Sequence, residues 1–313
     1  MKLHDVIRDY LAHQHSIGRI FTSRRFLLRA FNRAVGREVE IQHVDPNRVL
    51  AFLGRPTTRY WHDKYYALAC LYRYATSRGL ASWVPLPRTI PKISSQFVPY
   101  IYTHDDVRRL LEATNSYRKI HIVLEPHTFR AILLLLYGAG LRISEALSLR
   151  MNDVDLSQAL LLIRETKFYK SRLVPIGSQL QQAMKKFAET RWGVGHSEMP
   201  DAPFFIGRTG DQLTIPTVQQ SFRQLRAHAG IRRVGGARCQ PRLHDLRHAF
   251  CVNRLVAAYE AGADVTLLLP KLSTYVGHID LNSTQRYLTM TPALLQQACG
   301  RFERYAMAGG TDA

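Results

Sequence analysis

The sequence predicts a two-domain protein that is mainly α-helical, with a small β-sheet in its second domain. The chain has 313 residues, which is room for about two domains of ordinary size. Apolar residues recur at helical spacing from residue 1 to about residue 80. Prolines then interrupt the chain between residues 85 and 99, and two short β-prone runs follow in the second half.

Residues 1–85 predict a unit of four helices. Asp45 followed by Pro46 is typical of an N-cap with proline at the first helical position. Gly79 is expected to end the fourth helix. The apolar pattern of the second helix predicts a buried face that contains Phe26, Leu27, Ala30, Phe31 and Ala34.

Residues 86–99 predict a proline-rich, semi-rigid linker, and residues 100–313 a second domain. Thr103 and Asp106 form a capping-box variant at the start of a helix. Residues 159–164 and 171–176 predict a β-hairpin around a polar connector. Further helices are expected over residues 129–137, 180–188, 216–228, 244–260 and 292–305.

The charge balance predicts a polyanionic partner. Lys and Arg number 43 against 24 Asp and Glu, a formal net charge of +19, and residues 1–99 and the remainder are both basic. No apolar run approaches the roughly 18–20 residues that span a bilayer, and the charged first residues are unlike a signal peptide. We therefore expect a cytoplasmic protein that binds nucleic acid and no membrane.

The cysteines and histidines predict neither disulfides nor a metal site. Cys70, Cys239, Cys251 and Cys299 form no CxxC pair and no metal-ligand spacing. We expect reduced thiols, mostly buried, and no bound metal or other cofactor.

Three features of the second domain could carry chemistry. Arg142 follows a glycine pair and opens a short helix, where its guanidinium could face an anion. His244 and Arg247 lie three apart, so both project from one helix face. Lys167 lies at the hairpin turn, from which a long amine can reach a neighbouring site. Each feature alone is typical of a solvated surface residue.

Their order along the chain is the stronger signal. The sequence contains GLRxSE, then TKxxKxRxVP, then HxLRH, then GH, and a tyrosine nine residues after that GH. This ordered set, spread over most of residues 100–290, resembles the tyrosine recombinase family of phage integrases and Xer/Cre-like site-specific recombinases.

The resemblance implies a helical core-binding domain of SAM-like type, followed by an α/β tyrosine-recombinase catalytic domain. It implies an enzyme that cleaves and rejoins DNA strands through a 3′-phosphotyrosyl intermediate without a cofactor. By the same resemblance Tyr287 is the nucleophile, Lys167 the general acid and Glu145 a supporting residue. The full implied catalytic set is Arg142, Lys167, His244, Arg247, His278 and Tyr287.

These residue types suit phosphodiester cleavage. Two arginines can grip phosphate oxygens with charge-assisted hydrogen bonds of about 1.5–3 kcal/mol each. Histidines exchange protons near neutral pH, and a lysine can protonate the departing hydroxyl. A carboxylate beside a scissile phosphate would repel it, so Glu145 is expected to orient a neighbour.

Some assignments stay open within the motifs. Lys170 shares the hairpin turn with Lys167 and is an alternative acid, although the alignment of the hairpin favours Lys167. Tyr275 and Tyr305 are alternative phenols, and the GH-to-tyrosine interval favours Tyr287. His248 would face away from Arg247 on a helix and is interpreted as structural.

The expected partner is double-stranded DNA with specific recombination sites. Arg24, Arg25, Arg29 and Arg33 recur on adjacent helical turns and predict a face that follows phosphates. The resemblance implies a homotetramer on two paired sites and leaves partner recombinases or accessory proteins open. The segment before GH is longer than in Xer-like members, with an extra turn or loop around Pro270, and its LPxLxTYxGH string is closer to recombinases of mobile elements.

Three other functions compete with this hypothesis. One is a DNA-binding regulator on the same fold whose chemistry has lapsed, although the complete residue set argues against it. The second is a type IB topoisomerase, which shares the chemistry but relaxes supercoils without choosing a sequence. The third is a metal-dependent nuclease or transposase, which no carboxylate cluster in the sequence supports.

Overall fold

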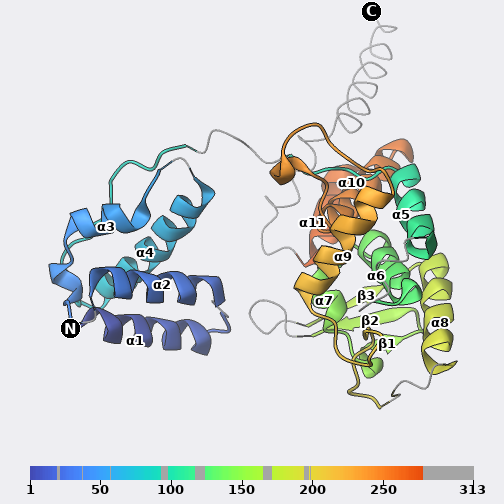
Figure 1. The fold of residues 1–313 in the computed structure, drawn as a ribbon, viewed down its shortest axis with the longest axis horizontal. Helices are drawn as coiled ribbons and strands as arrows, with labels where there is room; N and C mark the ends of the chain where they lie inside the picture. Colours follow the sequence, from blue (N-terminus) through green and yellow to red (C-terminus); the bar gives the residue numbers. More distant parts are fainter. Residues whose placement is uncertain are drawn as a thin grey trace, which may run out of the picture. The chain divides into compact units, whose positions relative to one another are not determined.

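Figure 1 presents the fold of the computed structural model. The structure describes residues 1–19, 22–36, 38–56, 58–92, 98–116, 124–164, 171–193, 197 and 199–277. They belong to two compact units, the first within residues 1–97 and the second from residue 98 onward, and each has its own apolar core. The described residues are mainly helical with a small three-stranded sheet, which confirms the predicted fold class.

The first unit is built from helices around one apolar core (Figure 1). Helix α2 packs against each of the other three α-helices. The predicted N-cap is present, since the Asp45 side chain accepts a hydrogen bond from the backbone N–H of Asn47 at 2.9 Å. The helices are α1 (Leu3–Ser16), α2 (Thr22–Val35), α3 (Pro46–Leu53) and α4 (Arg59–Ser77), with a 3₁₀ turn at Ile41–His43.

Helix α4 ends as the sequence predicts. Gly79 has a φ of +68°, which favours glycine. Its N–H donates to the Thr76 carbonyl at 3.1 Å, and the Leu80 N–H donates to the Ala75 carbonyl at 2.9 Å. This pair of bonds is the Schellman arrangement, which satisfies carbonyls that the helix end would otherwise leave without partners.

The buried face of α2 differs from the predicted one. Phe26 is 63% exposed, whereas Phe31 is fully buried. The core side chains of α2 are Leu27, Leu28, Phe31 and Val35. Positions 27, 31 and 35 form one line four residues apart, and the line through Phe26 lies one residue to the side, where two alanines offer little area to bury.

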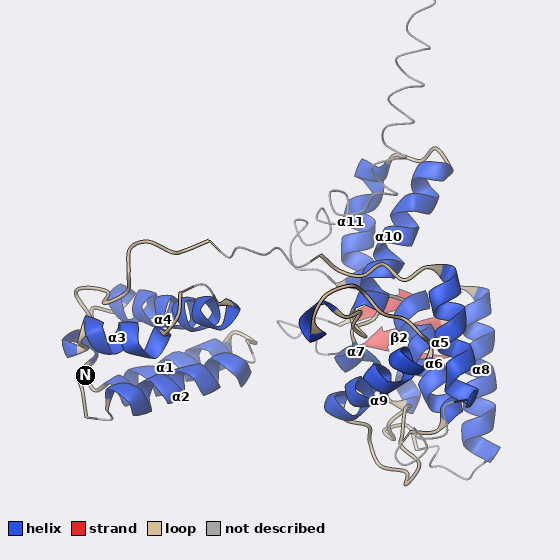
Figure 2. Ribbon diagram, turned by 45° about the horizontal axis from the view of Figure 1, so that its top comes forward, coloured by secondary structure: helices blue, strands red, loops and turns tan. Residues whose placement is uncertain are grey.

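The second unit combines helices with the sheet (Figures 1 and 2). Its α-helices are α5 (His104–Ser116), α6 (Pro126–Gly138), α7 (Ile143–Leu147), α8 (Ser178–Gly193), α9 (Ile215–His228), α10 (Asp245–Glu260) and α11 (Val265–Val276). Its 3₁₀ turns are Met151–Asp153 and Ala237–Cys239. The capping box of α5 forms as predicted, with Thr103 and Asp106 each accepting the other's backbone N–H at 3.0 Å.

The sheet has the order β1-β2-β3, with β1 (Val154–Asp155), β2 (Leu160–Ile163) and β3 (Arg172–Pro175). Strands β2 and β3 are the predicted pair and run antiparallel, with Leu161 opposite Val174. Strand β1 was not predicted, because two residues are too short for a periodic signal. Leu161, Ile163 and Val174 are buried and fix the face that meets the core.

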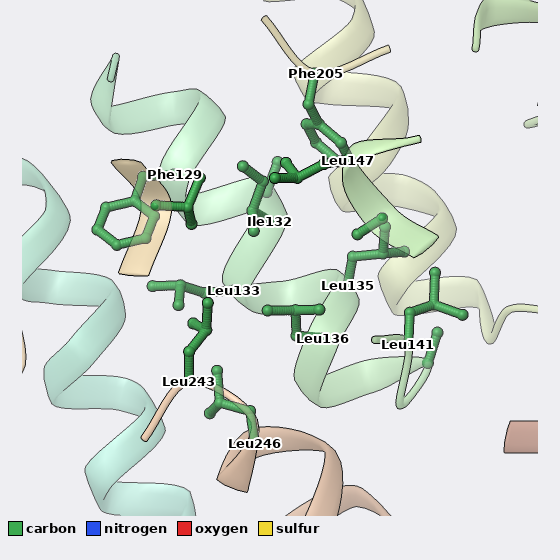
Figure 3. Close-up of a cluster of buried hydrophobic side chains, with 14 of the residues drawn as sticks. Phe129, Ile132, Leu133, Leu135, Leu136, Leu141, Leu147, Phe205, Leu243 and Leu246 are labelled. Carbon is green, nitrogen blue, oxygen red and sulfur yellow. The ribbon is translucent and has the colours of Figure 1, made fainter. Parts of the chain in front are cut away.

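Helix α6 lies at the centre of the second core (Figure 3). It packs against α5, α8 and α10, and it is apolar on several sides because it is covered on several sides. Leu243, just before α10, and Leu246, in its first turn, meet this cluster from far along the chain. The core therefore brings distant segments of the sequence to one place.

Helices α10 and α11 share a smaller apolar cluster, which includes Phe250, Leu255, Leu269 and Val276. The long segment before GH, expected as an extra turn or loop, is helix α11 with Pro270 inside it. The predicted helix over residues 292–305 lies outside the described residues.

The described cysteines are Cys70, Cys239 and Cys251, and each is a reduced thiol. Only Cys251 is buried, so the expectation of mostly buried thiols is wrong for these three. Cys299 lies outside the described residues. Within the described ranges, no helix is long and apolar enough to cross a membrane.

Two phenylalanines of α2 test the observed core. Phe31→Ala should destabilise the first unit by about 3–5 kcal/mol, because it removes a fully buried ring. Phe26→Ala, the matched exposed position, should change stability by less than about 0.5 kcal/mol. Urea unfolding of both variants measures the difference, and equal losses would contradict the observed orientation of α2.

Candidate active site

Core leucines anchor the predicted site residues of the second unit. Leu141, Leu243 and Leu246 are at most 4% exposed and belong to the cluster in Figure 3. Each immediately precedes a predicted site residue, respectively Arg142, His244 and Arg247. Because close packing fixes the backbone at each leucine, it also limits where the next side chain can point.

Arg142 is held by Glu145 at the start of α7. Its backbone N–H donates to Oε2 of Glu145 at 3.0 Å, and its guanidinium Nη1 donates to Oε1 at 2.6 Å. The Nη2 atom donates to the Gly277 carbonyl at 2.9 Å. Glu145 therefore contacts both the backbone and the guanidinium of Arg142.

Arg247 lies on α10 and is 1% exposed. Its Nη1 donates to the Gly140 carbonyl at 2.7 Å and its Nη2 to the Val276 carbonyl at 2.5 Å. The same Nη1 lies 3.7 Å from Oε2 of Glu145. The guanidinium groups of Arg142 and Arg247 thus meet at one carboxylate, although their helices are far apart in the sequence.

A third arginine joins this carboxylate and was not assigned a role from the sequence. Arg172 donates from Nη1 and Nη2 to the two oxygens of Glu145 at 3.2 and 3.0 Å, and from Nε to the Tyr275 carbonyl at 3.0 Å. It is the arginine of the TKxxKxRxVP motif. In the strand, Arg172 lies on the same face as the buried Val174. An arginine on a core-facing side requires a partner, and this alternation is the sequence signal that could have identified Arg172.

The charge of Glu145 is stabilised despite its burial. Burial alone would raise the pKa of the carboxyl, which is 8% exposed. Hydrogen bonds from Arg172 and from the Arg142 backbone, with the charges of both arginines, outweigh burial and hold the pKa of Glu145 below its ordinary value. One ionised carboxylate therefore holds several like-charged groups together.

His244 precedes α10, three residues before Arg247. Part of the residue is exposed to solvent, but withdrawal of the ring from bulk water, followed by the charges of His248, Arg247 and Arg242, lowers the pKa of His244 to about 4. The His248 ring stands edge-on to it at 4.8 Å between centroids. His244 is therefore neutral at physiological pH, so one ring nitrogen can donate a hydrogen bond and the other can accept one.

Two glycines permit this close packing. Gly277 ends α11 with a φ of +68°, and a Cβ there would lie 2.8 Å from Nη1 of Arg172. Gly140 has a φ of +61°, and a Cβ there would lie 2.4 Å from Cδ1 of Phe250. Any side chain would displace these neighbours, so only glycine lets the two backbones approach the arginines.

Three predicted catalytic residues, Lys167, His278 and Tyr287, lie outside the described residues, as do the alternatives Lys170 and Tyr305. The remaining alternative, Tyr275, is described. Its hydroxyl donates to the Pro175 carbonyl at 2.8 Å, and its ring stacks on Phe250. Burial raises the pKa of Tyr275, and its hydroxyl is already bonded to the end of β3.

The predicted phosphate-following arginines divide between two sides of α2. Arg25 and Arg29 are exposed and line a groove of about 550 Å³ between α1 and α2, together with Arg8 and Arg19. Arg33 lines a neighbouring hollow that also includes Arg29. Arg24 is half-buried instead, with Nη1 3.8 Å from Sγ of Cys70. The groove therefore groups Arg25 and Arg29 and leaves Arg24 apart.

The sequence model of the phage integrase family matches residues 101–293, which contain every residue of the predicted catalytic set. The chain belongs to the phage integrase family.

Curated relatives agree with this assignment over nearly the whole chain. The integrase/recombinase y4rB of Sinorhizobium fredii is 33% identical, covering 84% of this chain and 85% of the relative. A second, y4rE of the same organism, is 32% identical and covers 98% and 97%.

Comparison with solved structures shows that this chain shares its fold with tyrosine recombinases. An integrase of the transposon Tn1549, solved with a circular intermediate DNA, aligns with a TM-score of 0.69 at 17% identity, covering 96% of this chain and 99% of that one. A lambda integrase dimer bound to a core site aligns with a TM-score of 0.62 at 17% identity, covering 90% and 96%.

The Glu145 cluster generates a stability prediction for this family member. Glu145→Gln should destabilise the second unit by about 3 kcal/mol at pH 7, because it leaves three neighbouring guanidinium groups without their shared anion. A lowered folded-state pKa means that the carboxylate stabilises the fold above its ordinary pKa of 4.5 and loses that effect as the pH falls further.

Urea unfolding of wild type and Glu145→Gln at pH 7 and at pH 3.5 measures this effect. The difference in free energy of unfolding between wild type and variant should be smaller at pH 3.5 than at pH 7. A difference that stays constant or grows on acidification would contradict the assigned charge state of Glu145.

Proposed function

We propose that this protein is a site-specific DNA recombinase that cleaves and rejoins DNA strands through a 3′-phosphotyrosyl bond to Tyr287. The observation that carries the proposal is the convergence of Arg142 and Arg247 on one carboxylate, with His244 three residues from Arg247. A phosphodiester near these groups would meet fixed positive charge on its nonbridging oxygens, which is what an attacked phosphate requires. Family membership supports the same chemistry.

The reaction conserves the number of phosphate ester bonds. The phenolic oxygen of Tyr287 attacks phosphorus as its proton leaves to a base, and the bond from phosphorus to the 5′ oxygen breaks. Lys167 gives the departing 5′ oxygen a proton. The 3′ phosphate is then held as a tyrosyl ester, and attack by a 5′ hydroxyl from another strand reverses the steps. Rejoining therefore needs no ATP.

The described residues have distinct parts in this proposal. Arg142, whose side chain is 34% exposed, would contact the nonbridging oxygens, since guanidinium groups suit phosphate, and the buried Arg247 would add positive charge close by. His244, neutral because its pKa is about 4, would donate a hydrogen bond to phosphate or relay a proton. Glu145 orients the arginines and stays buried, so its charge does not face the phosphate directly. His278 would supply a further hydrogen bond.

The proposed partner is double-stranded DNA carrying specific recombination sites. The exposed arginines of the groove between α1 and α2 are suited to phosphate contacts, and the relatives solved with DNA support a DNA partner. We further propose a homotetramer on two paired sites, and service to a mobile element, for which the LPKLSTYVGH string is the support.

Tyr287→Phe tests the nucleophile. The variant should form no covalent protein–DNA complex while its affinity for DNA stays within about twofold, because only the attacking oxygen is lost. The assay traps the complex on a nicked suicide substrate and separates it on a denaturing gel. Tyr275→Phe is the matched control and should keep attachment, whereas covalent complexes in Tyr287→Phe would refute the assignment.

The same substrate separates the competing functions. A regulator with lapsed chemistry would bind the nicked duplex without attaching to it. A metal-dependent nuclease would lose activity in EDTA, whereas the proposed enzyme would keep it. A type IB topoisomerase would relax supercoiled plasmids that lack a recombination site, whereas the proposed enzyme would leave them supercoiled.

The groove between α1 and α2 gives a salt-dependence prediction. Affinity for DNA falls as salt rises, and the combined variant Arg25→Gln, Arg29→Gln should make this dependence shallower. The magnitude of the slope of log affinity against log salt should decrease by about 1.8, because each lost phosphate contact removes about 0.9. Arg24→Gln, half-buried on the other side of α2, should leave the slope unchanged. Filter binding between 50 and 200 mM salt measures both, and equal slopes for all variants would remove the groove from the interface.

A further inference from the structure

We propose that Arg172 is a positioning residue for strand cleavage, which fixes Glu145 and the last turn of α11 so that Arg142 and Arg247 are held ready for phosphate. The inference rests on the proposed function and goes beyond the six residues that the family resemblance implies.

The contacts of Arg172 are directed into the protein. Its side chain is 14% exposed, and each of its three guanidinium nitrogens donates a hydrogen bond, two to Glu145 and one to the Tyr275 carbonyl. A planar fork of donors allows this simultaneous grip on a carboxylate and a carbonyl. Arg172 therefore joins β3, α7 and the end of α11 through one side chain.

The charge of Glu145 explains why the contacts of Arg172 affect Arg142 and Arg247. With Arg172 present, the carboxylate receives two hydrogen bonds from β3 and is partly neutralised from that side. Without Arg172, its remaining charge would be met by Arg142 and by Arg247, whose Nη1 is 3.7 Å away. Arg247 would then be drawn toward Glu145, and Arg142, already bonded to it at 2.6 Å, would be held there more strongly, so both would be less available to a bound phosphate.

The end of α11 is the second object that Arg172 positions. Successive carbonyls of this turn accept from three arginines, Tyr275 from Arg172, Val276 from Arg247 and Gly277 from Arg142. Cationic side chains at the C-terminal end of a helix are favourable because its carbonyls carry partial negative charge. Gly277 leaves room for Arg172 there, since a Cβ would lie 2.8 Å from its Nη1. The next residue in the chain is His278, which belongs to the proposed catalytic set.

Arg172→Met tests the proposal in the full-length protein. It should slow covalent attachment to a nicked suicide substrate by about 10²-fold, the usual cost of displacing reactive groups by about 1 Å, with affinity for DNA unchanged within about threefold. Arg172→Lys keeps the charge without the planar fork and should stay at least about tenfold below wild type. Leu173→Ala, exposed on the same strand, is the matched control and should react at the wild-type rate.

A double-mutant cycle shows whether Arg172 acts through Glu145. If it does, the Glu145→Gln, Arg172→Met double variant should cleave no more slowly than the slower single variant, because the charge to be balanced has been removed. If the double variant instead shows a rate loss equal to the product of the two single losses, the proposal is overturned. Cleavage by Arg172→Met at the wild-type rate would overturn it as well. Near-UV circular dichroism of each variant establishes that it is folded.

Hydrogen exchange tests the same inference without DNA. Arg172→Met should increase amide exchange over residues 274–277 by about tenfold or more while α6 stays protected, because only the turn it holds is released. Unchanged exchange at this turn would overturn the proposal. If wild type attaches to no DNA, the proposed function fails, and the exchange result still decides whether Arg172 holds α11.

Discussion

The convergence of three guanidinium groups on Glu145 is the interaction on which the proposed site depends. Arg142 caps the start of α7, whereas Arg172 and Arg247 come from β3 and α10. Like charges at this spacing repel each other. A buried, ionised carboxylate offsets that repulsion, and its lowered pKa reflects the arginines' favourable interactions. Positive charge is therefore assembled before any phosphate arrives, which is the kind of preorganisation that stabilises developing charge in a reaction.

The end of α11 extends this assembly through backbone groups alone. Carbonyls of residues 275–277 accept from the same three arginines, so the helix end and the carboxylate share one set of donors. Gly277 makes the approach possible through its positive φ and its missing side chain. The positions of the arginines and of the chain that enters the GH motif are consequently coupled.

The two units use arginine in physically different ways. In the first unit Arg25 and Arg29 are exposed beside a groove, where interactions with phosphate are screened by salt and carry no sequence information. In the second unit Arg247 is almost fully buried, where interactions are screened little and geometry is fixed. Under the proposed function, the first arrangement would retain DNA and the second would act on one phosphate.

The sequence alone determined the helical units, the hairpin and the family, because helix periodicity, caps and an ordered motif are local properties of the chain. It also brought Arg142, Glu145, His244 and Arg247 into consideration through their motifs. Only the tertiary structure decided that Arg172 shares the carboxylate, that Arg24 lies apart from Arg25, and that Phe31 rather than Phe26 is buried. Those outcomes depend on which segments pack together, and no local pattern contains the contacts between residues distant in sequence.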